Sequence, residues 1–124
     1  MIKILYVEDN EDNVYMLSRR LKRKGFDIVI AVDGEQGVEM ASSEKPDLIL
    51  MDLSLPKMDG WTATKHIKSD EALKSIPIIA LSAHAMEDHK KRALESGCND
   101  YDTKPVDLDR LLSKILDQLG TKND

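Results

Sequence analysis

Four short apolar runs and a weaker fifth alternate with five longer stretches along the chain, and this alternation restricts the fold more than any other feature. The four apolar runs have the composition of buried strands, whereas apolar residues in the longer stretches recur at helical spacing. The expected strands cover residues 2–7, 27–32, 47–51, 76–81 and 99–103, and the expected helices cover residues 11–24, 34–44, 60–72, 86–97 and 107–119. Five alternating strand–helix units predict a parallel sheet with helices on both faces.

The order of the strands follows from the handedness of their connections. Crossovers between parallel strands are right-handed, which leaves few arrangements. One of the two common solutions is a doubly wound, flavodoxin-like α/β sheet with strand order 2-1-3-4-5. The first and third strands are then neighbours, and a ligand crevice opens beyond their carboxyl ends. We therefore expect the functional site at "VEDN" (7–10) and "LMDLS" (50–54).

The first and last helices have the clearest apolar stripes. In the first, Val14, Leu17 and Leu21 are expected to be buried, which leaves Met16 on another face. In the last, an N-terminal capping residue and a glycine just past the end mark the boundaries. The apolar stripe of this helix is Leu108, Leu111, Leu112, Ile115, Leu116 and Leu119, the capping residue is Asp107 and the glycine is Gly120.

Length and charge narrow the class of protein. A chain of 124 residues with 33% charged and 41% hydrophobic residues is typical of one soluble domain, here residues 1–124, rather than a disordered or membrane protein. The net charge is −5, and basic residues cluster only in "RRLKRK" (19–24), which argues against direct nucleic-acid binding. That cluster is either a solvated helix face or a surface that steers an acidic partner.

A single cysteine, Cys98, and the lack of a leader or long apolar span favour the cytoplasm.

Three carboxylates, those of Glu8, Asp9 and Asp52, are expected to converge at the crevice. Like charges held close together disfavour ionisation unless a cation or a basic group compensates them. Mg²⁺ suits such a site, since it binds one or two carboxylates together with waters and phosphate oxygens. The two common glycine-rich phosphate-binding motifs, GxxxxGK[ST] and GxGxxG, do not occur in the sequence. A carboxylate beside the metal could itself be the nucleophile that forms an aspartyl phosphate.

Two further polar residues follow the fourth and fifth strands. Ser82 ends the run "IALS" and Lys104 follows "YDT", so both side chains should reach the same edge of the sheet. Lys104 could balance the acids in the empty site and hold a phosphate oxygen in the occupied one, while Ser82 offers a hydroxyl donor. Pro105 fixes the backbone after Lys104 and makes a cis peptide bond possible.

These residues, in this order and spacing, resemble the receiver domain of two-component response regulators. The matching segments cover essentially the whole chain, and its single-domain length resembles the stand-alone regulators of chemotaxis or of cell-cycle phosphorelays. The segments are "VEDN" (7–10), "DLILMDLSLPKMDG" (47–60), "ALSAHA" (80–85) and "YDTKPVD" (101–107).

The resemblance implies a phosphorylation-controlled signalling switch. Asp52 would accept a phosphoryl group from the phosphohistidine of a sensor histidine kinase or a histidine phosphotransfer protein. Mg²⁺ would be coordinated by Asp9, Asp52 and the main-chain carbonyl of Ser54, and Glu8 would act mostly through water. The chain would catalyse only its own phosphoryl transfer and dephosphorylation, and would signal by contact with a downstream protein.

The resemblance also implies roles for residues around the acceptor. Ser82 would bond the phosphate, Lys104 would pair with it, and the ring of Tyr101 would follow Ser82 to change the surface of the fourth helix, fifth strand and fifth helix. Ser54 and His84 occupy positions that tune autodephosphorylation in relatives. The candidate residues for docking of the phosphoryl donor are Asn10, Asn13, Met16 and Pro105.

Other interpretations stay open at this stage. A flavodoxin-like cofactor binder could use the same fold, although the acids after the first strand would repel a flavin phosphate. A receiver-like adaptor that is never phosphorylated is a second alternative. The chain ends soon after the last helix, so it is expected either to act without an output domain of its own or to be a fragment of a longer regulator.

Overall fold

The computed structural model describes residues 1–55, 57–83 and 87–120, and strands and helices alternate along them. The observed order confirms the alternation expected from the sequence. The elements are β1 (Lys3–Val7), α1 (Glu11–Arg23), β2 (Asp27–Ala31), α2 (Gly34–Glu44), β3 (Leu48–Asp52), α3 (Gly60–Lys68), β4 (Ile78–Ser82), α4 (Glu87–Glu95), β5 (Asp100–Thr103) and α5 (Leu108–Gln118).

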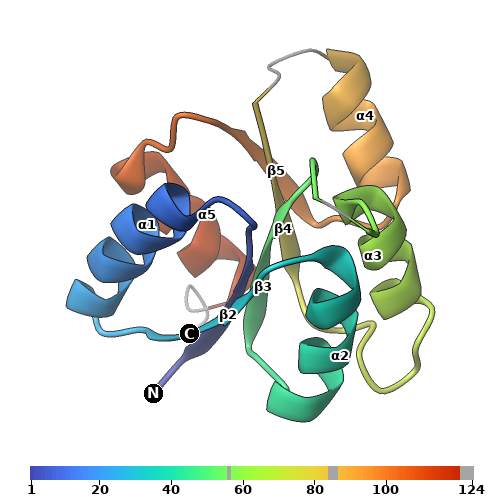
Figure 1. Ribbon diagram of the computed structural model, residues 1–124, viewed down its shortest axis with the longest axis horizontal. Coiled ribbons are helices and arrows are strands. Elements are labelled where there is room, and N and C mark those ends of the chain that lie inside the picture. The colour runs from blue at the N-terminus through green and yellow to red at the C-terminus, as the bar shows by residue number, and fades with distance from the viewer. Residues whose placement is uncertain (56, 84–86, 121–124) are drawn as a thin grey trace.

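The five strands form one parallel sheet in the order β2-β1-β3-β4-β5, as predicted. Helices α1 and α5 cover one face of the sheet, and α2, α3 and α4 cover the other (Figure 1). The neighbouring strands β1 and β3 therefore lead into helices on opposite faces, and their loops diverge at the carboxyl ends. No helix among the described residues has the length and apolar character needed to cross a bilayer.

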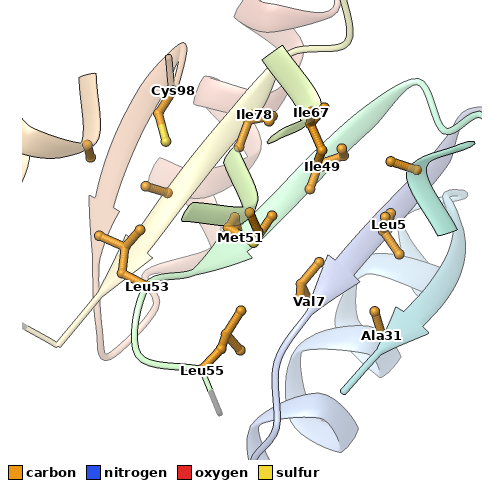
Figure 2. Close-up of a cluster of buried hydrophobic side chains, with 14 of the residues drawn as sticks. Leu5, Val7, Ala31, Ile49, Met51, Leu53, Leu55, Ile67, Ile78 and Cys98 are labelled. Atoms are coloured by element: carbon orange, nitrogen blue, oxygen red, sulfur yellow. The ribbon is translucent and has the colours of Figure 1, made fainter. Parts of the chain in front are cut away.

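Two apolar clusters, one on each face, hold the layers together. In β1, Leu5 and Val7 point to the face covered by α2 and α3, whereas Ile4 and Tyr6 point to the face covered by α1 and α5. Figure 2 shows the first cluster, in which Leu5 and Val7 lie with side chains of β3 and α3. Because both faces are covered, the central strands β1, β3 and β4 are largely apolar rather than alternating.

Capping side chains fix where the helices begin. In four helices a side-chain oxygen at the N-cap accepts a hydrogen bond from the backbone N–H three residues later, which satisfies an otherwise unpaired donor. The expected cap of α5 is among them, and Gly120 follows that helix with φ of 69°. The caps are Asn10 of α1, Asp33 of α2, Asp59 of α3 and Asp107 of α5.

Three details of the helices differ from the predictions. Helix α3 ends at Lys68 rather than at residue 72, because the N–H of Asp70 donates to the carbonyl of Ile67, three residues back, and the Asp70 carboxylate accepts from the N–H of Ala72 and starts a new turn. Leu116 does not join the buried stripe of α5: its side chain is 45% exposed, since the core contact runs through Leu111 and Ile115. In α1, Ser18 is buried, whereas Val14 is only half-buried.

Candidate functional site

The three acidic side chains expected at the crevice lie together. Glu8 directly follows β1, and Asp52 is the last residue of β3, which pairs with β1. Oxygen atoms from the carboxylates of Glu8, Asp9 and Asp52 lie within 4.8 Å of one another. Glu8 and Asp52 are buried, and Asp9 is exposed. The cluster therefore combines two shielded carboxylates with one that solvent reaches.

Lys104 supplies the basic group that such a cluster requires. Its Nζ lies 2.9 Å from Oε1 of Glu8 and 3.4 Å from Oδ2 of Asp52. Its backbone N–H donates to the carbonyl of Ser82 at 2.7 Å, which ties the start of the loop after β5 to the end of β4. The peptide bond between Lys104 and Pro105 is cis, as the sequence made possible. One ammonium group thus bridges two carboxylates.

Glu8 is held as an anion by several donors. Oε1 of Glu8 accepts a hydrogen bond from the Tyr6 hydroxyl at 3.2 Å, and Oε2 accepts one from the Asn10 N–H at 3.3 Å. Burial by itself raises the pKa of Glu8, but the hydrogen bond from Lys104 and its charge more than reverse this, so the pKa lies below its ordinary value. Burial, and then the Glu8 carboxylate, raise the pKa of Tyr6, so its hydroxyl stays protonated and able to donate.

The pKa of Asp52 is shifted in the opposite direction from that of Glu8. Burial, and then the nearby charge of Glu8, raise its pKa to about 6, although Lys104 and the Ser54 N–H oppose the shift. The Ser54 N–H lies 3.3 Å from Oδ1, and the Ser54 residue is exposed. At neutral pH the Asp52 carboxylate is therefore an anion that the protein stabilises incompletely. Such a group gains from a cation and keeps its nucleophilic character.

The donor set fits a hard divalent cation. Carboxylate oxygens are the ligands that Mg²⁺ prefers, and Mg²⁺ keeps several waters when it binds through one or two carboxylates. Exposed Asp9 gives an approach from solvent, and buried Asp52 gains charge compensation that Lys104 supplies mainly to Glu8. Within the described segments, this is the one group of three or more acidic, histidine or cysteine side chains close enough to bind a metal ion.

Ser82 and Tyr101 lie on neighbouring strands beside the cluster. Ser82 ends β4 and is 2% exposed, and Leu81 next to it pairs with Asp52 of β3. Tyr101 of β5 pairs with Ala80, so Ser82 and Tyr101 face the same side of the sheet. The Tyr101 ring is buried in the apolar cluster of that side. His84, the other residue expected to influence phosphate lifetime, falls outside the described residues.

The candidate docking residues lie mostly around one groove. Asn13, Met16 and Pro105 line an open groove of about 150 Å³ between α1 and the loop after β5, and Lys104 lines it too. The Met16 side chain is 53% exposed. Asn10 does not line this groove, because its side chain caps α1. The groove therefore reaches from the exposed face of α1 to Tyr6 and Lys104, which both contact Glu8 of the acidic cluster.

Sequence reasoning missed two contributors to the site. Tyr6 was assigned only to a buried strand, yet its hydroxyl bonds to Glu8; a tyrosine in an otherwise apolar strand signals such a partner, since a buried hydroxyl requires one. Gly60 starts α3 so close to β3 that a Cβ there would lie 2.3 Å from the Asp52 carbonyl oxygen. Nothing in the sequence alone distinguishes Gly60 from an ordinary turn glycine.

Comparisons with known proteins agree with this geometry. The family model for the response regulator receiver domain matches residues 4–116. The polar-differentiation response regulator DivK of Brucella anthropi is 35% identical over 117 residues, which are 94% of this chain and 95% of that protein.

Two solved structures share both fold and sequence features. The receiver domain of the sensor histidine kinase PA1611 from Pseudomonas aeruginosa, with a magnesium ion coordinated in its active-site cleft, is 36% identical with a TM-score of 0.90, covering 96% of this chain and 98% of that one. A chain from the co-crystal of the Saccharomyces cerevisiae phosphotransfer protein Ypd1 with the receiver domain of Ssk1 is 35% identical with a TM-score of 0.88. That match covers 94% of this chain and 88% of the other.

Proposed function

The chain belongs to the response regulator receiver domain family of two-component systems, and from this premise we propose that it is a signalling switch phosphorylated on Asp52. The donor would be the phosphohistidine of a sensor kinase or a histidine phosphotransfer protein. The observation that carries the proposal is the contact set of Asp52, a buried carboxylate beside Glu8, Asp9 and the Lys104 ammonium at the end of β3. A rigid strand end holds the carboxylate in one position for an incoming phosphorus atom.

The transfer needs the negative charge of the site to be offset. Asp9, Asp52 and the Ser54 carbonyl are our candidate direct ligands of Mg²⁺, and Glu8 is a candidate that acts through water. When bound, Mg²⁺ supplies positive charge for the carboxylates and for the phosphoryl oxygens. An Asp52 oxygen forms a bond to phosphorus while the phosphorus–nitrogen bond of the donor breaks. The electron pair returns to the imidazole nitrogen, which takes up a proton.

Phosphorylation would give Lys104 and Ser82 new interaction partners. The carboxylate becomes an acyl phosphate with close to two negative charges. Lys104 then pairs with a phosphate oxygen, and the Ser82 hydroxyl donates to another. Tyr101, on the same side of the sheet as Ser82, transmits the change to the surface of α4, β5 and α5, where a downstream protein binds. Ser54, together with His84, would set the lifetime of the phosphate.

The partners follow from the same proposal. Asn13, Met16 and Pro105 line the groove beside Lys104 and, with Asn10, are the residues we propose for donor docking. The complex of Ypd1 with the Ssk1 receiver supports this kind of partner for a receiver of similar sequence.

We propose one receiver domain over residues 1–124, acting in the cytoplasm through protein contacts, with no direct binding to nucleic acid or membrane. Its only chemistry would be its own phosphoryl transfer and dephosphorylation.

Incubation with acetyl phosphate and Mg²⁺, followed by intact mass spectrometry, tests the proposal. Wild type and Asp12→Asn should each gain one phosphoryl group, and Asp52→Asn should gain none. Asp12 is a matched control because it is an exposed acid in the first turn of α1, outside the acidic cluster. Equal labelling of Asp52→Asn and wild type would contradict Asp52 as the acceptor.

A further inference from the structure

The second half of α1 carries positive charge that no carboxylate of the described residues balances. We define the basic face as Arg19, Arg20, Arg23 and Lys24, which are all exposed. Over the described part of the chain, none of the four forms an ion pair with a carboxylate, although the whole chain has a net charge of −5. An uncompensated cationic surface on an acidic protein is suited to an anionic partner.

Part of this face is held in a fixed arrangement. The Arg19 guanidinium donates to the Tyr15 hydroxyl at 3.1 Å and lies 5.1 Å from the centre of the Tyr15 ring. A cation over an aromatic ring loses less freedom when it binds a partner, because its position is already restricted. Lys22, by contrast, lies toward Val32 on the other side of the helix and is not part of the basic face.

The basic face continues directly from the groove beside the acidic cluster. Arg20 lines that groove together with Met16 and Pro105. Arg20 also lines two shallow hollows farther along α1, one with Arg23 and Lys24 and the other with Met16, Arg19 and Arg23. From Asn13 to Arg23 the helix rises about 15 Å. One surface therefore runs from Lys104 over apolar side chains to a cationic end.

We propose that the basic face receives an acidic strip on the protein that donates the phosphoryl group to Asp52. This inference rests on the proposed function and adds a requirement for the partner. The donor must present an apolar side chain to the groove of Met16 and Pro105. It must also present carboxylates, about one to two helical turns farther along α1 than Met16, to Arg20, Arg23 and their basic neighbours.

The charge pattern of α1 favours a protein over a membrane or a nucleic acid. The helix begins with Glu11 and Asp12, and Asp9 lies just before it, all three exposed. An extended polyanion laid along this face would meet these acids as well as the basic residues. A folded protein can place opposite or neutral side chains against each end. The acids therefore restrict the partner to a surface of mixed charge.

The expected consequence is faster association of the donor at low ionic strength. Charges at the rim of an interface act mainly on the association rate, and salt screens them. Transfer from a phosphorylated protein should therefore slow as salt is added, whereas labelling by acetyl phosphate should respond far less, because that small molecule does not cover α1.

Phosphotransfer profiling provides the test. The sensor kinases and phosphotransfer proteins encoded in the genome that carries this chain are phosphorylated one by one, and the donor with the fastest transfer is used. Transfer at limiting receiver concentration is then measured at low and physiological salt for wild type and Arg20→Glu/Arg23→Glu. The matched control is Lys45→Glu/Lys65→Glu, which makes the same change of charge at two exposed positions on the opposite face of the sheet, one directly after α2 and one in α3.

The proposal predicts that reversal of the basic face slows transfer by about tenfold or more at low salt and removes most of its salt dependence. The control variant should match wild type, and all variants should be labelled equally by acetyl phosphate. Equal transfer to both charge-reversed variants would overturn the proposal while leaving the proposed function intact. Failure of every donor on wild type would instead overturn phosphotransfer from histidine, and the inference with it.

Binding to vesicles of phosphatidylglycerol and phosphatidylcholine and to a short DNA duplex tests the other anionic surfaces. We expect no binding of wild type to either at physiological salt. Binding that disappears in Arg20→Glu/Arg23→Glu, together with unchanged phosphotransfer, would assign the basic face to a lipid or nucleic acid and overturn the proposal.

Discussion

Lys104 contacts Glu8 more closely than it contacts Asp52: its Nζ lies 2.9 Å from Glu8 Oε1 and 3.4 Å from Asp52 Oδ2. The hydrogen bond and charge of the lysine outweigh the effect of burial at Glu8 and lower its pKa, whereas at Asp52 burial and then the charge of Glu8 outweigh the lysine and raise the pKa. Asp52 is left with a partial counter-charge. It is the carboxylate of the pair that gains more from a metal ion or a phosphoryl group.

Replacement of Lys104 by Met should destabilise the fold at neutral pH. Buried Glu8 loses its main cation, so its pKa should rise, and the free energy of unfolding should fall by about 2–3 kcal/mol. The loss should grow from about pH 5 to pH 8, as the unpaired carboxylates ionise. Urea unfolding of wild type and variant at several pH values measures this loss of unfolding free energy. The double variant Lys104→Met/Glu8→Gln should recover most of the stability; a double variant as unstable as the single one would contradict this account of the pair.

Asp52→Asn should stabilise the protein above about pH 6. The native carboxyl has a pKa of about 6 against an ordinary value of 3.8, so the native state binds this proton more tightly than the unfolded state. Ionisation of Asp52 therefore lowers the free energy of unfolding as pH rises from about 4 to about 6, by up to about 3 kcal/mol. Glu8, whose pKa is lowered, contributes the opposite dependence.

The difference in unfolding free energy between wild type and Asp52→Asn isolates this effect. It should be near zero at about pH 4 and should grow to about 1–3 kcal/mol in favour of the variant at about pH 8. Asp12→Asn, which removes an exposed charge, should show no such trend. Loss of stability in Asp52→Asn at neutral pH would rule out an unfavourable buried charge.

Mg²⁺ should stabilise the native protein through the acidic cluster. A ligand at ten times its dissociation constant adds about 1.4 kcal/mol to the free energy of unfolding. Asp9→Asn should weaken this stabilisation, because Asp9 is the exposed carboxylate of the cluster, whereas Asp12→Asn should retain it. Thermal unfolding with Mg²⁺, against sodium chloride of equal ionic strength, is the measurement. Equal stabilisation of the two variants would contradict a site that includes Asp9.

Gly60→Ala should disturb the site through the contact between the start of α3 and the main chain of Asp52. The new methyl group would lie 2.3 Å from the Asp52 carbonyl oxygen and 2.8 Å from the Leu53 Cα, so α3 must move away from β3. We expect a loss of about 2 kcal/mol or more in unfolding free energy and slower labelling by acetyl phosphate.

Gly37→Ala is the matched control for Gly60→Ala. The three atoms nearest to its Cβ would all be side-chain atoms of Val7, the nearest at 3.1 Å, and alanine is the better helix former by about 1 kcal/mol. It should cost less stability and leave the labelling rate unchanged. A Gly60→Ala protein as stable and as reactive as Gly37→Ala would show that the start of α3 does not constrain Asp52.

The order of the elements and the position of the crevice could be predicted because the central strands β1, β3 and β4 are buried on both faces. Uninterrupted apolar runs such as "ILYV" and "LILM" identify the strands, and parallel topology then brings the residues after β1 and β3 to one edge. Glu8 and Asp52 could thus be paired across a long separation in sequence.

Other features depend on three-dimensional contacts that a pattern does not contain. The early end of α3 follows from the bonds that Asp70 makes to Ile67 and Ala72, and Leu116 is exposed because α5 is buried through Leu111 and Ile115. Helical spacing extends equally well through Asp70 and Leu116. The preference of Lys104 for Glu8 over Asp52 is a matter of half an ångström.

The location of the phosphoryl group tests the central claim most directly. Wild type is labelled with acetyl phosphate and Mg²⁺ and then reduced with borohydride, which converts an aspartyl phosphate to homoserine. Peptide mass spectrometry identifies the converted residue. We predict homoserine at position 52 alone, with Asp9 and Asp12 unchanged. Conversion at another residue, or a stable phosphate on a hydroxyl side chain, would contradict Asp52 as the acceptor.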